Sequence, residues 1–119
     1  MNFKELARNL EMGEEEFLEI VDLFFETTSS DLGKLQSAVE ERDAQGVAET
    51  AHSIKGAAAI LTLAEIYEAA KRIEMDAREN HLERTNGAVK TIKEKIDLIA
   101  EALFKGRIDD KGTSPNPKF

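Results

Sequence analysis

One histidine of this sequence stands among small side chains that would leave its ring accessible. His52 is followed by Lys55 and Gly56, and three alanines come directly after the glycine. If the segment is helical, Ala48, Gly56 and Ala59 lie at i−4, i+4 and i+7 from His52, while Lys55 lies at i+3. A reactive imidazole needs this clearance, and an ammonium group one turn away can share a bound phosphoryl group. The spacing therefore predicts a phosphate-carrying histidine.

An imidazole can perform this chemistry without an activated serine or cysteine. It titrates at a pH of roughly 6.5, so at neutral pH most of it carries a free lone pair that can attack phosphorus. A phosphoryl group brings about two negative charges, which Lys55 can partly neutralise as a mobile point charge. A glycine inside a helix costs about 1 kcal/mol relative to alanine, so Gly56 calls for a reason. That reason is either the close approach of a second protein or a packing contact with a neighbouring helix.

The elements that must position these residues are helices. Apolar residues recur three and four apart, the spacing of helices that bury one face, over residues 17–39, 47–61, 63–77 and 89–103. A shorter amphipathic segment over residues 3–10 ends near Gly13, and Asp43 is suited to cap the helix that carries His52. Four long helices with short connectors predict an all-α fold, an antiparallel up-down four-helix bundle with a short extra N-terminal helix across one end.

The same periodicity divides the chain and orients His52. His52 falls outside the apolar line of its own helix, so we expect its ring to be exposed. We expect the bundle to occupy residues 1–104. Residues 105–119 lack apolar periodicity and hold both prolines, which predicts a disordered tail.

The composition excludes several classes of function. The 24 acidic and 16 basic residues give a formal net charge of −8, and the basic residues are scattered, so we expect no binding to nucleic acid or to an anionic membrane. Without cysteine the chain has no disulfide framework and no thiolate metal site. Its longest apolar stretch, residues 56–64, is too short to span a bilayer, and its first residues carry no signal-peptide pattern, so we expect a cytoplasmic protein.

The run of residues 51–58, AHSIKGAA, resembles the signature of the histidine-containing phosphotransfer (Hpt) domains and the phosphorylated domain of chemotaxis histidine kinases. The similarity continues through Ile66, Ala70, Ile73 and Glu74, and the expected helix order agrees over roughly residues 1–104. The chain departs from the family's common pattern at Thr62 and Leu63, where many members have glycine and alanine. We therefore expect the connector after the third helix to differ from theirs.

The resemblance implies a phosphorelay. His52 would accept a phosphoryl group from a phosphoaspartate on one response-regulator receiver domain and pass it to an aspartate on another, and a hybrid histidine kinase is a further candidate partner. The phosphate would sit on the outer ring nitrogen with Lys55 near it, and Gly56 would permit docking. Glu74 stands at the spacing where the chemotaxis-type domain has a glutamate that hydrogen-bonds the other ring nitrogen. Its alternative is a solvated glutamate at the edge of a helix's core line.

The chain has no glycine-rich nucleotide loop and little room for an ATP-binding module, so we expect a phosphocarrier without autokinase activity and without a cofactor. The predicted partner-binding surface is a platform of small residues around His52 that includes Ala48, Gly56 and Ala59. Leu23 or Phe25 would extend it, with Leu23 either exposed for a partner or covered by the first helix. We expect the protein to be a monomer.

Two other functions compete with a phosphorelay. Glu49 and His52 form one Glu-x-x-His pair of the kind found in metal-binding bundles, but the second pair is missing because Arg78 stands three residues before His81. We therefore expect no metal site. A helical adaptor that binds a partner without covalent chemistry remains the main alternative. Replacing His52 with glutamine separates them, because a relay protein would still bind receivers but would accept no phosphate.

Overall fold

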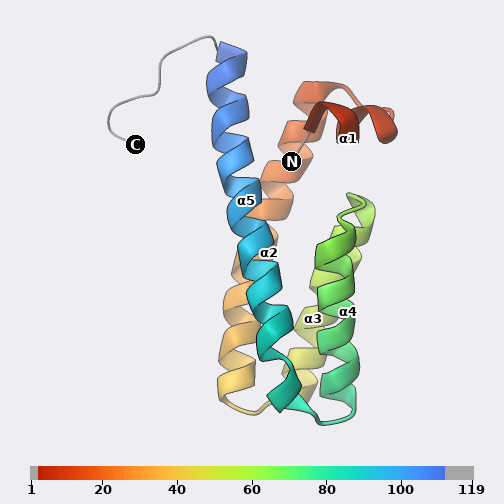
Figure 1. Cartoon of the computed structure of the whole chain (residues 1–119), viewed down its shortest axis with the longest axis vertical. Helices are drawn as coiled ribbons and strands as arrows, with labels where there is room; N and C mark the ends of the chain where they lie inside the picture. Colours follow the sequence, from red (N-terminus) through yellow and green to blue (C-terminus); the bar gives the residue numbers. More distant parts are fainter. Residues whose placement is uncertain (1–2, 112–119) are drawn as a thin grey trace, which may run out of the picture.

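The structure is a computed structural model that describes residues 3–111, with side chains described for residues 4–105. The described part is all helical, in the order α1 (Phe3–Asn9), α2 (Glu14–Glu40), α3 (Ala44–Ile60), α4 (Ala64–Arg78), the short 3₁₀ helix η1 (Leu82–Arg84) and α5 (Asn86–Lys111). Helices α2 to α5 run alternately up and down, and α1 lies across the end where α2 begins (Figure 1). The predicted antiparallel four-helix bundle with a short extra helix is confirmed.

Each long helix turns one apolar line into a shared core. The largest fully buried hydrophobic side chains come from all four helices and from the turn after α3: Phe17, Leu35, Val21, Val47, Ile54, Leu61, Ile66, Ile73, Ile92 and Ile99. Burying such a side chain contributes about 1.5–3 kcal/mol relative to leaving it exposed. Three residues near the ends of the predicted lines, Val39, Leu63 and Val89, are only partly buried, because the helices begin or end beside them.

The helices begin with the signals that the sequence carries. The side chain of Asp43 accepts a hydrogen bond from the backbone N–H of Gly46 at 3.0 Å, so the predicted cap of α3 is present. Three glutamates, residues 14–16, occupy the first turn of α2, where negative charge interacts favourably with the helix dipole. Helix α2 passes through its Thr-Thr-Ser-Ser segment without interruption.

Three long helices, α2, α3 and α4, end in turns of the same type, and none of these turns has glycine at its left-handed position. Arg42, Thr62 and Asn80 have φ values of 57°, 56° and 61°, in the left-handed region that favours glycine. After α3, the N–H of Thr62 donates to Ala59 O at 3.2 Å and the N–H of Leu63 to Ala58 O at 2.9 Å. This pair of bonds satisfies carbonyls that the helix leaves free. Thr62, one of the departures from the family pattern, thus holds a strained conformation.

The expected boundary at residue 104 is not where α5 ends. The helix continues to Lys111, so the first part of the predicted tail is helical. Extending an existing helix forms one hydrogen bond for each residue added, and this extension needs no apolar pattern. The rest of the predicted tail, residues 112–119, lies outside the described residues.

Helices α3 and α4 make the most extensive contact in the bundle. Their buried faces carry many small side chains, namely Ala51 and Ala58 on α3 and Ala69, Ala70 and Ala77 on α4. Small residues let two helix backbones approach closely. A side chain at the edge of this interface on one helix can therefore reach a side chain on the other.

We predict that Thr62→Gly stabilises the protein by about 1 kcal/mol. A left-handed conformation costs a β-branched residue about 1–3 kcal/mol, and the greater chain entropy of glycine offsets about 0.5–1 kcal/mol of the relief. Urea unfolding followed by circular dichroism measures the change. The control is Thr27→Gly, the same substitution at an exposed right-handed position inside α2, which should destabilise. A loss of stability with Thr62→Gly would contradict the strain.

Candidate functional site

His52 lies on an open side of α3. Its side chain is 64% exposed, as its place outside the apolar line predicted. A Cβ added to Gly56 would meet nothing within 4 Å, and Ala59 is exposed one turn further on. Gly56 is therefore not a packing contact between helices, and the surface beside the ring carries no large side chain at Gly56 or Ala59.

The neighbouring helix α4 supplies a carboxylate to this ring. Glu74 is a buried residue, with its side chain only 8% exposed, and its two oxygens face three nitrogen groups. Nδ1 of His52 lies 2.9 Å from Oε2, and a guanidinium nitrogen of Arg78 donates to the same oxygen at 2.8 Å. Nζ of Lys55 donates to Oε1 at 2.7 Å. Glu74 thus joins His52 and Lys55 of α3 to Arg78 of α4.

These contacts decide the charge of Glu74. Burial by itself raises the pKa of this carboxyl group, but hydrogen bonds from Lys55, Arg78 and His52 stabilise the ionised form more strongly. Together they lower the pKa of Glu74 from its ordinary 4.5 to about 2. At neutral pH the group is a carboxylate, which can only accept hydrogen bonds.

An accepting carboxylate assigns the proton on the histidine. Because Glu74 cannot donate, the hydrogen bond at Nδ1 of His52 requires the proton to be on Nδ1. In a neutral ring with Nδ1–H, the free lone pair is on Nε2. Glu74 therefore orients the ring and leaves the free lone pair on Nε2, the ring nitrogen that does not contact the carboxylate.

Lys55 stands one turn from His52 as expected, but its ammonium group contacts Glu74. Its side chain is 23% exposed and bonds Oε1 of that carboxylate. A lysine has three donors on a flexible stem, so Nζ can exchange one partner for another nearby.

Arg78 is the contact that sequence reasoning missed. In the sequence it stands out only as the residue that breaks a second Glu-x-x-His pair. Its distance from Glu74, four positions along α4, is a signal that could have found it, because such residues are neighbours on a helix surface. That spacing alone would not have shown that the glutamate also reaches across to α3.

The residues predicted to bind a partner differ in exposure. Leu23 is 64% exposed and so is not covered by α1, while Phe25 is half-buried against the core. The expectation that Ala48 lies on the exposed platform is wrong. Ala48 is buried, and it lines a groove with Ala77 and Arg78 because α4 packs over this part of α3. Ile60, which the sequence analysis did not single out, is among the most exposed hydrophobic side chains described.

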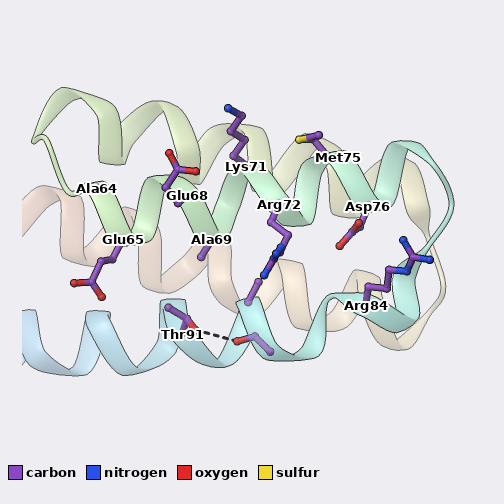
Figure 2. A pocket seen from close by; sticks show the side chains of 12 residues that line it. Ala64, Glu65, Glu68, Ala69, Lys71, Arg72, Met75, Asp76, Arg84 and Thr91 are labelled. Atoms are coloured by element: carbon purple, nitrogen blue, oxygen red, sulfur yellow. Dashed lines mark hydrogen bonds between the residues drawn. The ribbon is translucent and has the colours of Figure 1, made fainter.

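A second groove runs between α4 and α5, away from the histidine. Figure 2 shows it with the Arg72 side chain reaching from α4 toward α5. Its lining includes charges of both signs, but neither His52 nor Glu74 belongs to it. Arg72 is thus a cation of α4 that lies outside the histidine site.

Two further properties concern the part of the chain that the structure describes. Within residues 4–105, histidine and carboxylate side chains form no group of three or more that could hold a metal ion. None of the described helices is long and apolar enough to cross a membrane.

Comparisons with known proteins agree with this fold. The profile of a family described as the Hpt domain matches residues 19–102. The crystal structure of histidine-containing phosphotransfer protein B (HptB) from Pseudomonas aeruginosa PAO1 is similar, with a TM-score of 0.77 and 24% sequence identity over 90% of this chain and 93% of that chain. At this identity the likeness shows the fold. No curated protein sequence matches the chain significantly.

We predict that Glu74 makes stability depend on pH in the acid range. Its folded-state pKa of about 2 lies below the ordinary 4.5, so its stabilising effect is complete above about pH 4.5 and is lost as the pH falls toward 2. Glu74→Gln, which cannot ionise, should be less stable at pH 6 by an amount on the order of 1–3 kcal/mol. Urea unfolding at several pH values should show this gap close between pH 4.5 and 2. A gap that stays constant over this range would contradict the prediction.

Proposed function

This chain belongs to the Hpt domain family and has the family's histidine phosphotransfer role, and on that premise we propose that it carries phosphoryl groups between receiver domains. Nε2 of His52 accepts the group from a phosphoaspartate on one receiver and passes it to an aspartate on another. The observation that supports this most directly is the hydrogen bond from Nδ1 to Glu74, which leaves Nε2 as the free nucleophile on an exposed ring.

The transfer follows from where the proton is held. The lone pair of Nε2 forms a bond to phosphorus while the bond from phosphorus to the aspartate oxygen breaks, and that electron pair returns to the aspartate carboxylate. Nδ1 keeps its proton throughout, so the phosphorylated ring carries a positive charge. The carboxylate of Glu74, 2.9 Å from Nδ1, stabilises that charge. The second transfer reverses these steps onto a new aspartate.

Lys55 supplies charge to the group in transit. A phosphoryl group carries about two negative charges, more than the one carboxylate oxygen that Nζ contacts in the free site. We propose that Nζ turns from Glu74 to the phosphoryl oxygens when the group arrives. The turn is short because Lys55 lies one helical turn from His52 on the same helix.

The receiver docks on the surface of small residues beside the ring. Gly56 and Ala59 give it a floor of small residues, and a receiver aspartate must approach Nε2 closely. Exposed hydrophobic side chains on α2 and α3, namely Leu23 and Ile60, offer apolar contact area, with Phe25 partly available.

We further propose in what state the protein works and where its phosphoryl group comes from. The protein does not phosphorylate itself, acts as a monomer in the cytoplasm, and receives its phosphoryl group from response-regulator receivers or from a hybrid histidine kinase. Incubation with ATP alone should therefore leave no label on the chain, whereas a phosphorylated receiver should label it.

We predict that the wild-type protein acquires an acid-labile, base-stable label from phosphorylated receiver domains, and that His52→Gln acquires none. Phosphohistidine is labile in acid, while the donor's phosphoaspartate is labile in base, so the two are distinguishable. Mass spectrometry locates the label, and pull-down of the receivers measures binding. His52→Gln should still bind them, because glutamine keeps the size and polarity of the site. A wild-type protein that binds receivers without becoming labelled is an adaptor, and the proposal fails.

We predict that Gly56→Trp blocks transfer from receivers but leaves the bundle folded. A Cβ at this position meets no atom within 4 Å apart from its own stretch of helix, so the indole should project into the space that a receiver needs. Transfer should fall at least tenfold, about the effect of losing 1.4 kcal/mol of docking free energy. Leu98→Trp, at an exposed position on α5, is the control and should transfer normally. Normal transfer by Gly56→Trp would show that the docking surface lies elsewhere.

A further inference from the structure

The charges around His52 do not balance until a phosphoryl group is present. In the free site, the carboxylate of Glu74 faces two cations, Lys55 and Arg78. The form of His52 that can attack phosphorus is the neutral ring, which adds no charge. The site therefore has one positive charge in excess. Phosphorylation adds about two negative charges on the phosphoryl group and one positive charge on the ring, which brings the sum close to zero. Without Arg78 the phosphorylated site would be net negative.

The two cations hold different oxygens of Glu74 and have different freedom to move. Lys55 bonds Oε1, and Arg78 bonds Oε2, the same oxygen that His52 contacts. If Lys55 turns to a phosphoryl group, Oε1 loses its donor while Glu74 stays almost fully buried. A buried carboxylate without a cation is costly, so Glu74 would tend to keep Lys55 if no other cation were present.

Arg78 is suited to prevent this. It belongs to α4, the helix of Glu74 itself, whereas His52 and Lys55 belong to α3. Its guanidinium has five donors in a planar fork that can serve one or both oxygens of a carboxylate. Its contact with Glu74 spans one helical turn, so it does not depend on the position of Lys55.

We propose that Arg78 is a positioning residue that holds Glu74 against His52 while Lys55 leaves to bind the phosphoryl group. This inference rests on the proposed function and deepens it. It assigns the two cations separate tasks: Lys55 follows the phosphoryl group, and Arg78 keeps the carboxylate ionised and in place behind the ring. Arg78 does not touch the reacting atoms and acts through Glu74.

The test measures how fast His52 is phosphorylated by phosphoramidate, a small donor that needs no docking surface. Nε2 of His52 attacks its phosphorus, the P–N bond breaks and ammonia leaves. The variants are Arg78→Ala and Arg78→Lys, each in the wild-type chain and in Glu74→Gln. Arg72→Ala is the matched control, because Arg72 is a cation of the same helix that lies in the α4–α5 groove (Figure 2). Moderate salt screens the general loss of positive charge.

We expect Arg78→Ala to slow labelling about two- to fivefold, the range of an exposed ion pair since 62% of the Arg78 side chain is exposed. Arg78→Lys should recover most of the rate, and Arg72→Ala should leave it unchanged. In Glu74→Gln, Arg78→Ala should have no further effect, because the group through which it acts is gone.

Three outcomes would overturn the inference. Arg78→Ala could label like the wild type, or it could lower the unfolding temperature without slowing labelling, which indicates a structural role. An equal slowing in the Glu74→Gln background would show that Arg78 acts directly on the phosphoryl group. Each of these leaves the relay function standing as long as the wild-type chain is labelled on His52. No label on the wild type from any donor would instead reject the proposed function.

Discussion

One buried carboxylate organises the side chains around His52. Glu74 is shielded from water, yet it stays ionised because three nitrogen groups from two helices donate to it. Its ionised state requires the proton on Nδ1 of His52, and this leaves the lone pair on Nε2. The tautomer of His52 and the orientation of its ring both depend on this one group. A neutral glutamine in its place could satisfy fewer of the donors, because an amide presents only one accepting oxygen.

The contact between α3 and α4 makes this arrangement possible. Alanines on both buried faces let the backbones approach, so a carboxylate at the edge of one helix meets an imidazole on the other. The faces that these two helices turn toward the core are buried, whereas the His52 side chain on the outer face of α3 is exposed. Gly56 and Ala59, which follow His52 on α3, keep the surface beside the ring free of large side chains, whereas Ala48 lies one turn before His52, where α4 packs over it. His52 thus lies beside a closely packed pair of helices with its own ring exposed.

Conformational strain marks the turn after α3. Thr62 adopts a backbone conformation that favours glycine, and two backbone hydrogen bonds across the turn hold it there. The tight reversal places α4 directly beside α3 and in antiparallel register. The departure from the family pattern at this residue therefore changes only the side chain of the turn. The backbone still takes the left-handed conformation that glycine adopts more easily than other residues do.

Much of the fold follows from local patterns. Spacings of three and four residues predicted the helices, and every residue of the apolar line from Val47 to Leu61 is buried. The same wheel placed His52 outside that line, and the ring is exposed. Periodicity is less informative at helix ends, where the chain's neighbours change. It therefore did not predict that α5 continues to Lys111.

The sequence by itself determined that His52 stands on a helix and outside its apolar line, because residue type and helical periodicity are local properties. Only the tertiary structure decided which side chains form hydrogen bonds with Glu74. In the sequence, position 74 stood at the edge of its helix's core line, where a solvated glutamate was slightly favoured, and nothing pointed to the contact of Arg78 with Glu74. Ala48 was misplaced for the same reason. Burial and hydrogen bonding across two helices depend on how closely their axes approach and at what register, and the spacing along either helix alone does not contain that distance.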